Sequence, residues 1–232
     1  MGKAVFITGT DTDAGKSVVT AQLLRGLGRA GLRVAGMKPV ASGCEWRDGR
    51  LWSADVAVHA AASTVPVASE LAAPYLFEPP VSPHIAAREA GVRIDLAHLQ
   101  HCLAGLRQQT DVVLVEGAGG WLAPLSDELT MADLAAALDL PVILVVGMRL
   151  GCINHAMLSA AAILASSCRL LGWVANPLEP AMNRYADNLA YLTAHMPAPL
   201  LAELEHRPDA GELVLPVDSG LLAALELPVR QS

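Results

Sequence analysis

The sequence predicts an α/β fold, a three-layer α/β/α sandwich in which helices cover both faces of a mainly parallel central sheet. Short runs rich in Val, Ile and Leu alternate with longer Ala- and Leu-rich stretches along the 232 residues. Two of the short runs are almost continuously apolar, as is typical of parallel strands covered on both faces. Hydrophobic residues make up 53% of the chain, enough for a sizeable core.

The expected elements alternate between strand and helix. The runs that predict strands are 3–8, 32–39, 111–117, 141–147 and 170–176. The stretches that predict helices are 15–30, 96–109, 130–138 and 154–166. This alternation implies right-handed crossovers between parallel strands, so ligands should bind at the carboxyl ends of the strands.

Two stretches are less regular. The first, 43–94, contains five prolines between positions 66 and 83, and we expect it to pack over the carboxyl edge of the sheet. The second, 177–232, is also interrupted by prolines, and its pattern predicts no definite architecture. Neither repeats nor linkers divide the sequence, so we expect a single domain over 1–232.

The charge and apolar patterns exclude several classes of protein. The net charge is −7 and no Lys/Arg cluster is present, which disfavours a nucleic-acid partner. The strongest apolar run, 140–148, is far shorter than the roughly 20 residues that span a bilayer. Without a signal-peptide pattern at the N-terminus, we expect a cytoplasmic protein with no membrane partner.

The cysteines and histidines show no metal-ligand pattern. The four cysteines, Cys44, Cys102, Cys152 and Cys168, are widely spaced, so we interpret them as buried thiols rather than zinc ligands or disulfides. The seven histidines have no metal-ligand spacing either, and we expect His98 and His101 at the surface.

The segment "TGTDTDAGKS" (8–17) ends in Gly-Lys-Ser between a predicted strand and a predicted helix. A strict phosphate-binding P-loop would have glycine at position 10, where Thr10 stands. Phosphate binding needs inward backbone N–H groups, a helix N-terminus and a lysine that reaches the phosphates, and the predicted strand–loop–helix order with Lys16 is suited to provide them. The hydroxyl of Ser17 could ligate Mg²⁺, or it could simply cap the helix.

Two charged residues end predicted strands at the same edge. Lys38, in "AGMKPVASG", is expected to be exposed and to point into the cleft, where it could stabilise a transferring phosphoryl group. Glu116 ends the apolar run in "VLVEGAGG", and burying its carboxylate costs free energy unless it pairs with a cation. Together with Ser17 and a second acid, Glu116 could complete a Mg²⁺ site. Asp55 is the candidate for that acid, although it could instead be a helix N-cap.

Two glycine-containing segments could also contact a ligand. Gly117, Gly119 and Gly120 would allow its close approach to the backbone. The amides of 151–154, at the start of a predicted helix, could bind a carboxylate or phosphate, or they could form an ordinary strand–helix loop.

Five motifs together resemble those of dethiobiotin synthetases: "TGTDTDAGKS", "AGMKPVASG", "VLVEGAGGW", "PVILVVGMRLGCINHAM" and "GWVAN". The resemblance covers about residues 3–204. It implies a P-loop NTPase-like fold, a homodimer, and an ATP- and Mg²⁺-dependent ligase of the penultimate step of biotin biosynthesis. The implied substrates are 7,8-diaminopelargonic acid and CO₂. One amine would form a carbamate, which attacks the γ-phosphate; the other amine would then displace phosphate from the mixed anhydride and close the ring.

The resemblance also implies roles for individual residues. The catalytic residues would be Lys38, Lys16 and Thr12, and the metal ligands Ser17, Asp55 and Glu116. The nucleotide would contact Asp13, Ala14, Gly15, Lys16, Ser17, Val18, Asp55, Glu116, Gly117, Ala118, Gly119, Asn176 and Pro177, with Asn176 at the adenine. The substrate would contact Thr12, Lys38, Ser42, Gly151, Cys152, Ile153 and Asn154, the last four reaching across the dimer to its carboxylate tail.

Several positions depart from the family pattern. Ser17 stands where threonine is common, and Asp13 replaces a frequent glutamate. Pro177 replaces an expected aspartate, and 203–208 read "ELEHRP" instead of a Pro-and-apolar stretch. Because the resemblance places Pro177 and 203–208 beside the adenine, we hypothesise that the protein discriminates more weakly among nucleoside triphosphates.

The principal alternative is a nucleotide-dependent switch ATPase of the chromosome-partitioning type. Such switches have a signature lysine five residues before the P-loop lysine, where this chain has Asp11. An amidating synthetase of the cobalamin pathway is a further alternative. Its glutamine-hydrolysing domain needs a nucleophilic cysteine, and we expect this chain to be too short to contain such a domain.

Overall fold

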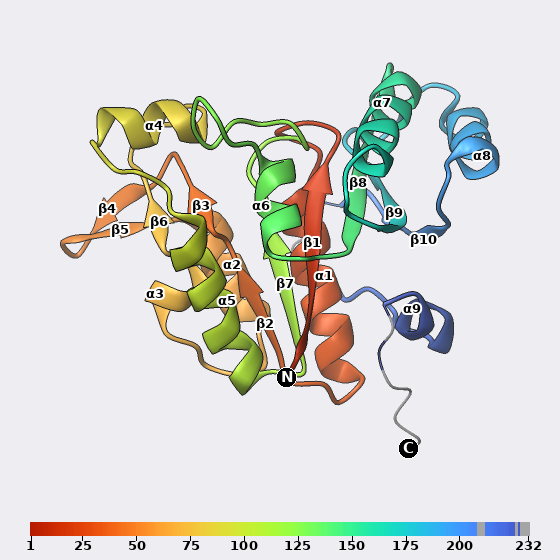
Figure 1. Ribbon diagram of the computed structural model, residues 1–232. Coiled ribbons are helices and arrows are strands. Elements are labelled where there is room, and N and C mark those ends of the chain that lie inside the picture. The colour runs from red at the N-terminus through yellow and green to blue at the C-terminus, as the bar shows by residue number, and fades with distance from the viewer. Residues whose placement is uncertain (208–211, 226, 228–232) are drawn as a thin grey trace.

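The computed structural model describes residues 1–207, 212–225 and 227. Within them, one parallel sheet contains β1 (Lys3–Gly9), β2 (Val34–Met37), β7 (Val112–Glu116), β8 (Val142–Met148), β9 (Leu170–Pro177) and β10 (Leu200–Glu203). The strands lie in the order β10-β9-β8-β1-β7-β2, which places β1 in the interior between β8 and β7 (Figure 1). Because the strands of this sheet are parallel, their carboxyl ends lie at the same edge.

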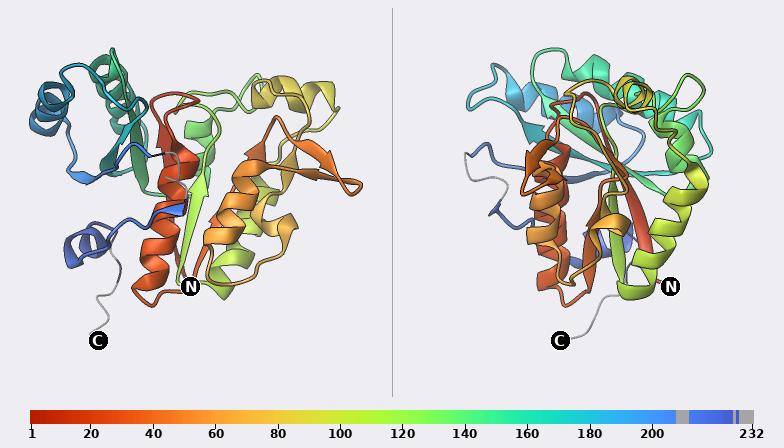
Figure 2. Two further views of the ribbon diagram at one scale, coloured as in Figure 1. Left: turned by 180° about the vertical axis from the view of Figure 1, so that it is seen from behind. Right: turned by 90° about the vertical axis from the view of Figure 1, so that its left-hand side faces the viewer.

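The helices cover both faces of the sheet. They are α1 (Lys16–Arg29), α2 (Ala54–Ala62), α3 (Ser69–Ala72), α4 (Pro83–Glu89), α5 (Leu96–Gln109), α6 (Met131–Ala137), α7 (Cys152–Leu164), α8 (Tyr185–His195) and α9 (Ser219–Ala224). Figure 2 shows α1 on one face and α5 on the other. The predicted three-layer α/β/α sandwich is thus confirmed.

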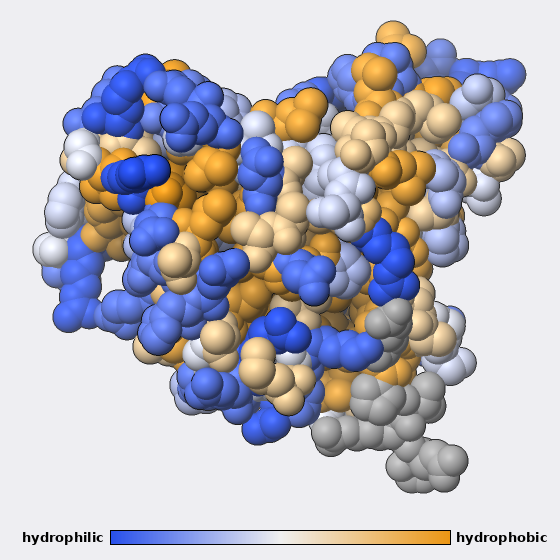
Figure 3. Space-filling view, viewed as in Figure 1, coloured by the Kyte–Doolittle hydropathy of each residue, from blue (hydrophilic) through white to orange (hydrophobic). Residues whose placement is uncertain are grey.

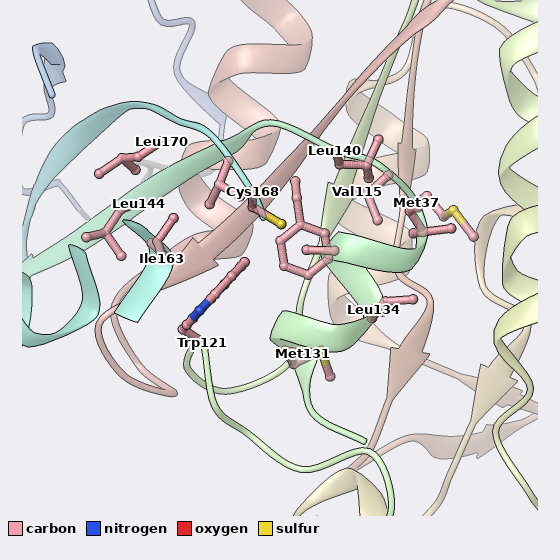
Figure 4. Close-up of a cluster of buried hydrophobic side chains, with 14 of the residues drawn as sticks. Met37, Val115, Trp121, Met131, Leu134, Leu140, Leu144, Ile163, Cys168 and Leu170 are labelled. Carbon is pink, nitrogen blue, oxygen red and sulfur yellow. The ribbon is translucent and has the colours of Figure 1, made fainter. Parts of the chain in front are cut away.

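Alternation along the buried strands produces two hydrophobic clusters, one on each face of the sheet. Val5 and Ile7 of β1 pack with α1 and α9, whereas Phe6 packs with α5, α6 and α7. Figure 4 shows part of the second cluster, to which Trp121, Met131 and Leu134 of α6 and Val115 of β7 belong. The rings of Phe6 and Trp121 meet edge to face, with centroids 6.2 Å apart. This packing holds the central strands rigidly under the loops at their carboxyl ends.

The predicted strands and helices are all present, with ends shifted by a few residues. The helix expected from 154 begins at Cys152 because Gly151, with φ of +94°, already forms its N-cap. The sequence did not predict β10, because its apolar run of three residues is too short to distinguish a strand from a loop or helix segment.

The irregular stretch 43–94 follows the prediction only in part. The antiparallel hairpin of β4 (Glu45–Arg47) and β5 (Arg50–Trp52) and helix α4 lie toward the carboxyl end of the sheet (Figure 1). Two-residue strands β3 (Val40–Ala41) and β6 (Tyr75–Leu76) pair nearby. In contrast, α2 packs along β2 and α1, and α3 packs against α5, because their apolar residues cover the side of the sheet rather than its edge.

Some predictions extend beyond what the structure describes. The single domain over 1–232 stays a prediction, and its residues 208–211, 226 and 228–232 lie outside the described residues, as does Pro208 of "ELEHRP". Among the described helices, none combines the length and the apolar character needed to cross a bilayer.

Candidate active site

A cavity of about 340 Å³ lies where β1, β2 and β7 end. Most of its lining comes from three predicted motifs: the loop between β1 and α1, the residues after β2, and the residues after β7. The lining residues are Thr12, Asp13, Gly15, Lys16, Ser17, Val18, Lys38, Ala41, Ser42, Asp55, Glu116, Ala118 and Gly119. Residues up to 107 positions apart in the chain thus meet in one cleft, because parallel strands end at one edge.

The loop wraps around its own lysine. The Nζ of Lys16 donates to the carbonyl oxygens of Asp11 and Thr12, each at 3.0 Å. Burial and the neighbouring ammonium of Lys38 lower the pKa of Lys16 to about 8, although nearby carboxylates partly oppose this shift. An ammonium held beneath a loop at a helix N-terminus is suited to bind phosphate.

Gly15 shapes the turn into α1. Its φ of +88° lies in the left-handed region, and a Cβ at this position would collide with the Nδ2 of Asn176. The same amide nitrogen donates to the carbonyl oxygen of Ala14 at 2.9 Å. Asn176, near the end of β9, therefore contacts the loop without lining the cavity. Because Gly15 occupies the N-cap and no side chain caps this helix, the alternative in which Ser17 serves only as a cap is excluded.

Three oxygen-bearing side chains converge on one side of the cleft. The Oγ of Ser17 lies 2.8 Å from the Oδ1 of Asp55 and 2.8 Å from the Oε1 of Glu116. Ser53, not Asp55, is the N-cap of α2, so the alternative role for Asp55 is also excluded. A hydroxyl with two carboxylates fits Mg²⁺, which prefers oxygen ligands and usually completes its octahedron with phosphate oxygens and water. No group of three or more His, Cys, Asp or Glu that could hold a metal was found among the described residues, so these other oxygens would have to complete the coordination.

Lys38 is buried, which corrects the prediction of an exposed strand-end lysine. Its Nζ lies 2.6 Å from the Oε1 of Glu116 and 2.8 Å from the Oδ2 of Asp55. Only 4% of Lys38 is exposed, because the two acids approach from β7 and α2 and enclose it. Burial lowers the pKa of Lys38, but the two carboxylates outweigh this effect and raise it above its ordinary value.

Glu116 is fully buried and stays ionised. Burial alone would raise its pKa, but Lys38 and His59 outweigh burial and hold the pKa below its ordinary value. The Nε2 of His59 lies 2.7 Å from the Oε2 of Glu116. The sequence motifs indicate no role for His59. Its position four residues after Asp55 is the signal that could have identified it, since residues at that spacing share one face when they lie on a helix, as they do on α2.

The segment predicted to read the substrate tail lies outside this cavity. Gly151, Cys152, Ile153 and Asn154 form the N-cap and first turn of α7, and Cys152 is buried. Just before them, the guanidinium of Arg149 pairs with Asp11 of the loop. This contact connects the start of α7 to the cleft. Pro177 ends β9, and neither it nor Asn176 lines the cavity.

Comparisons with known proteins identify relatives in sequence and in fold. A family model described as "AAA domain" matches residues 3–212. An ATP-dependent dethiobiotin synthetase of Pseudomonas paraeruginosa is 48% identical over 209 residues, which are 90% of this chain and 92% of the relative. One from Aromatoleum aromaticum is 48% identical over 204 residues, covering 88% and 91% of the two chains.

Similar solved structures concern the fold alone. The septum site-determining protein MinD of Pyrococcus horikoshii, complexed with Mg-ADP, has a TM-score of 0.56 at 16% identity, covering 97% of this chain and 94% of that one. A ParA family ATPase of Chlorobium tepidum has a TM-score of 0.55 at 14% identity, covering 97% and 91%. These likenesses confirm the P-loop NTPase architecture.

Proposed function

The chain belongs to the AAA-domain family and, within it, to the ATP-dependent dethiobiotin synthetases, and from this premise we propose how its cleft carries out the reaction. The protein is an ATP-dependent ligase that forms dethiobiotin in biotin biosynthesis. The observation that best supports the scheme below is that Lys16, Lys38, Ser17, Asp55 and Glu116 meet in a single cavity at the end of the sheet.

The proposed substrates are 7,8-diaminopelargonic acid, CO₂ and ATP. One amine adds to CO₂ and loses a proton, giving a carbamate. A carbamate oxygen attacks the γ-phosphorus, and ADP leaves. The second amine then attacks the carbonyl carbon of the carbamic–phosphoric anhydride, phosphate leaves, and a five-membered cyclic urea closes. Because both amines belong to one molecule held in place, ring closure is intramolecular and gains from proximity.

The two lysines have separate roles in this scheme. Lys16, buried under the loop, holds the β- and γ-phosphates. Lys38 approaches the cavity from the end of β2 and offsets negative charge that develops on the transferring phosphoryl group. Thr12 and Ser42 also line the cavity, and we assign them to the diamine and phosphate. Asp13, Ala14, Gly15 and Val18 contribute to the nucleotide side.

Ser17, Asp55 and Glu116 would hold Mg²⁺, as their oxygen-only donor set and 2.8 Å contacts support. When bound, Mg²⁺ would neutralise phosphate charge and align the γ-phosphate. Glu116 can serve as a ligand at neutral pH because its pKa lies below the ordinary value.

We propose that the protein acts as a homodimer in which the first turn of α7 meets the partner. Leu150 is 94% exposed directly before this turn, and Leu158 and Leu164 of α7 are also exposed. Figure 3 shows apolar side chains gathered over α7. In such a dimer, the amides of Gly151–Asn154 would bind the carboxylate tail of a substrate held in the other subunit. Light scattering of the wild type and a Leu150→Asp variant tests this: a monomeric wild type contradicts the proposal.

The switch-ATPase alternative is not favoured. The chain shares only 16% and 14% identity with the MinD and ParA structures, against 48% with the synthetases. Asp11, where those switches have their signature lysine, pairs with Arg149 instead.

The reaction scheme is tested with ¹⁸O-labelled bicarbonate, unlabelled ATP, Mg²⁺ and 7,8-diaminopelargonic acid. We expect dethiobiotin, ADP and phosphate that carries one ¹⁸O, because the attacking carbamate oxygen stays on phosphorus when the ring closes. A Lys38→Met variant should form no product above background. Dethiobiotin with unlabelled phosphate would refute the mixed anhydride, and no dethiobiotin from the wild type would refute the activity itself.

A further inference from the structure

We propose that His59 is a positioning residue for Glu116: it fixes one carboxylate oxygen of Glu116 so that the other faces the cation site. This inference rests on the metal site proposed above. His59 does not line the cavity, so it acts through Glu116 rather than on the substrate.

The two oxygens of Glu116 have separate partners. Oε2 lies 2.7 Å from the Nε2 of His59, behind the cavity. Oε1 lies 2.6 Å from the Nζ of Lys38 and 2.8 Å from the Oγ of Ser17, on the cavity side. A carboxylate held in this way cannot rotate without breaking the histidine contact. Oε1 is therefore presented to a cation in one orientation.

The burial of the ring determines which of its nitrogens can donate to Glu116. His59 is 2% exposed, and its Nδ1 has no hydrogen-bond partner in the described part of the chain. A proton on Nδ1 would be buried without an acceptor, which is costly, whereas a proton on Nε2 meets an ionised carboxylate. The contact between His59 and Glu116 is therefore a hydrogen bond in which Nε2 donates and Oε2 accepts.

The backbone holds His59 close to the sheet. Asp55 and His59 stand four residues apart on α2, so one helix carries both a proposed ligand and the residue that orients another. Gly36 of β2 permits this approach, because a Cβ there would lie 2.7 Å from the Cβ of His59 and 3.2 Å from its Nδ1. The position of His59 on α2 and the missing side chain at Gly36 together let the ring come within hydrogen-bond distance of Glu116.

Two matched substitutions isolate the hydrogen bond. Gln and Met have similar length and flexibility, but only Gln can donate to Oε2. His59→Gln and His59→Met both lose the ring, so effects of that loss cancel between them. The readout is Mg²⁺ affinity of the enzyme–ADP complex, measured by calorimetry without turnover. ADP affinity in a chelator and thermal unfolding serve as companion measurements, and His101→Met, at an exposed position of α5, is the control.

We expect His59→Met to weaken Mg²⁺ binding by about 10- to 100-fold, the range typical for residues that orient metal ligands. His59→Gln should recover most of this loss, and ADP affinity without Mg²⁺ should change little in either variant. Equal Mg²⁺ affinities of the Gln and Met variants would overturn the positioning role. A wild type whose ADP complex does not bind Mg²⁺ would instead overturn the metal site itself.

Discussion

Replacing Lys38 by Met should destabilise the fold, because it removes a buried charge from between two acids. Glu116 is fully buried, whereas 40% of the Asp55 side chain is exposed. After the substitution Asp55 can turn to water, but Glu116 remains buried with its charge. Most of the loss of stability should therefore come from the buried, unpaired charge of Glu116.

The magnitude follows from the partners that remain. Removing one member of a buried ion pair typically costs about 3–5 kcal/mol. Here the Nε2 of His59 and the Oγ of Ser17 still lie 2.7 and 2.8 Å from Glu116, so we expect a loss near the lower end, about 3 kcal/mol. Removing both charges in Lys38→Met/Glu116→Gln should bring stability back to within about 1 kcal/mol of the wild type, since neutral replacements of buried pairs are often tolerated.

Urea unfolding in a chelator, without nucleotide, measures these differences in the free energy of unfolding. The wild type, both single variants and the double variant form a double-mutant cycle. A Lys38→Met variant that loses less than about 1 kcal/mol would refute the reasoning, as would a double variant no more stable than Lys38→Met.

The pH dependence of the free energy of unfolding tests independently whether the charge on Glu116 stabilises or destabilises the fold. In the wild type the folded-state pKa of Glu116 is lowered from 4.5, so its ionised form stabilises the fold above about pH 4.5, and this contribution is lost as the pH falls toward the folded-state value. In Lys38→Met, burial without the ammonium should raise that pKa. The stability difference between the two proteins should therefore be largest near neutral pH and shrink in acid.

Three further predictions concern the loop, the thiols and the nucleotide. Gly15→Ala should abolish ADP binding because its Cβ would collide with Asn176, whereas Gly31→Ala, with a similar φ of +82° but open space, should bind ADP normally; equal calorimetric affinities would contradict this. All four cysteines are free and buried, and burial raises the pKa of each thiol, so iodoacetamide at pH 8 should label them only after denaturation; rapid labelling of the native protein would disprove their burial. Competition of ATP with CTP and GTP should reveal weak discrimination, and strict preference for ATP would refute the hypothesis drawn from Pro177.

The sequence was most informative where local pattern and chemistry coincide. Gly-Lys-Ser between a strand and a helix located the loop, and charged residues at the ends of strands located Lys38 and Glu116. Parallel strands bring such ends to one edge, so their meeting could be predicted without knowing any distance. The roles assigned to these residues stay predictions until they are measured.

Features that depend on contacts distant in sequence could not be predicted. The burial of Lys38 depends on Glu116, 78 residues away, and on the path of α2, which the sequence left undefined. The support of Ala14 by Asn176 spans 162 residues. Apart from its spacing from Asp55, nothing local in the sequence marks His59, because its place depends on α2 packing against Gly36 of β2.

The charges at the base of the cleft have a consequence for the order of binding. Two ammonium groups, Lys16 and Lys38, face two carboxylates, Asp55 and Glu116, so the cluster is electrically balanced before any ligand arrives. A divalent cation entering alone would leave an excess of positive charge and would compete with Lys38 for the same oxygens. A cation that arrives together with a polyphosphate would bring its own counter-charge. The cleft should therefore bind the metal only when the nucleotide is present and reject the free metal.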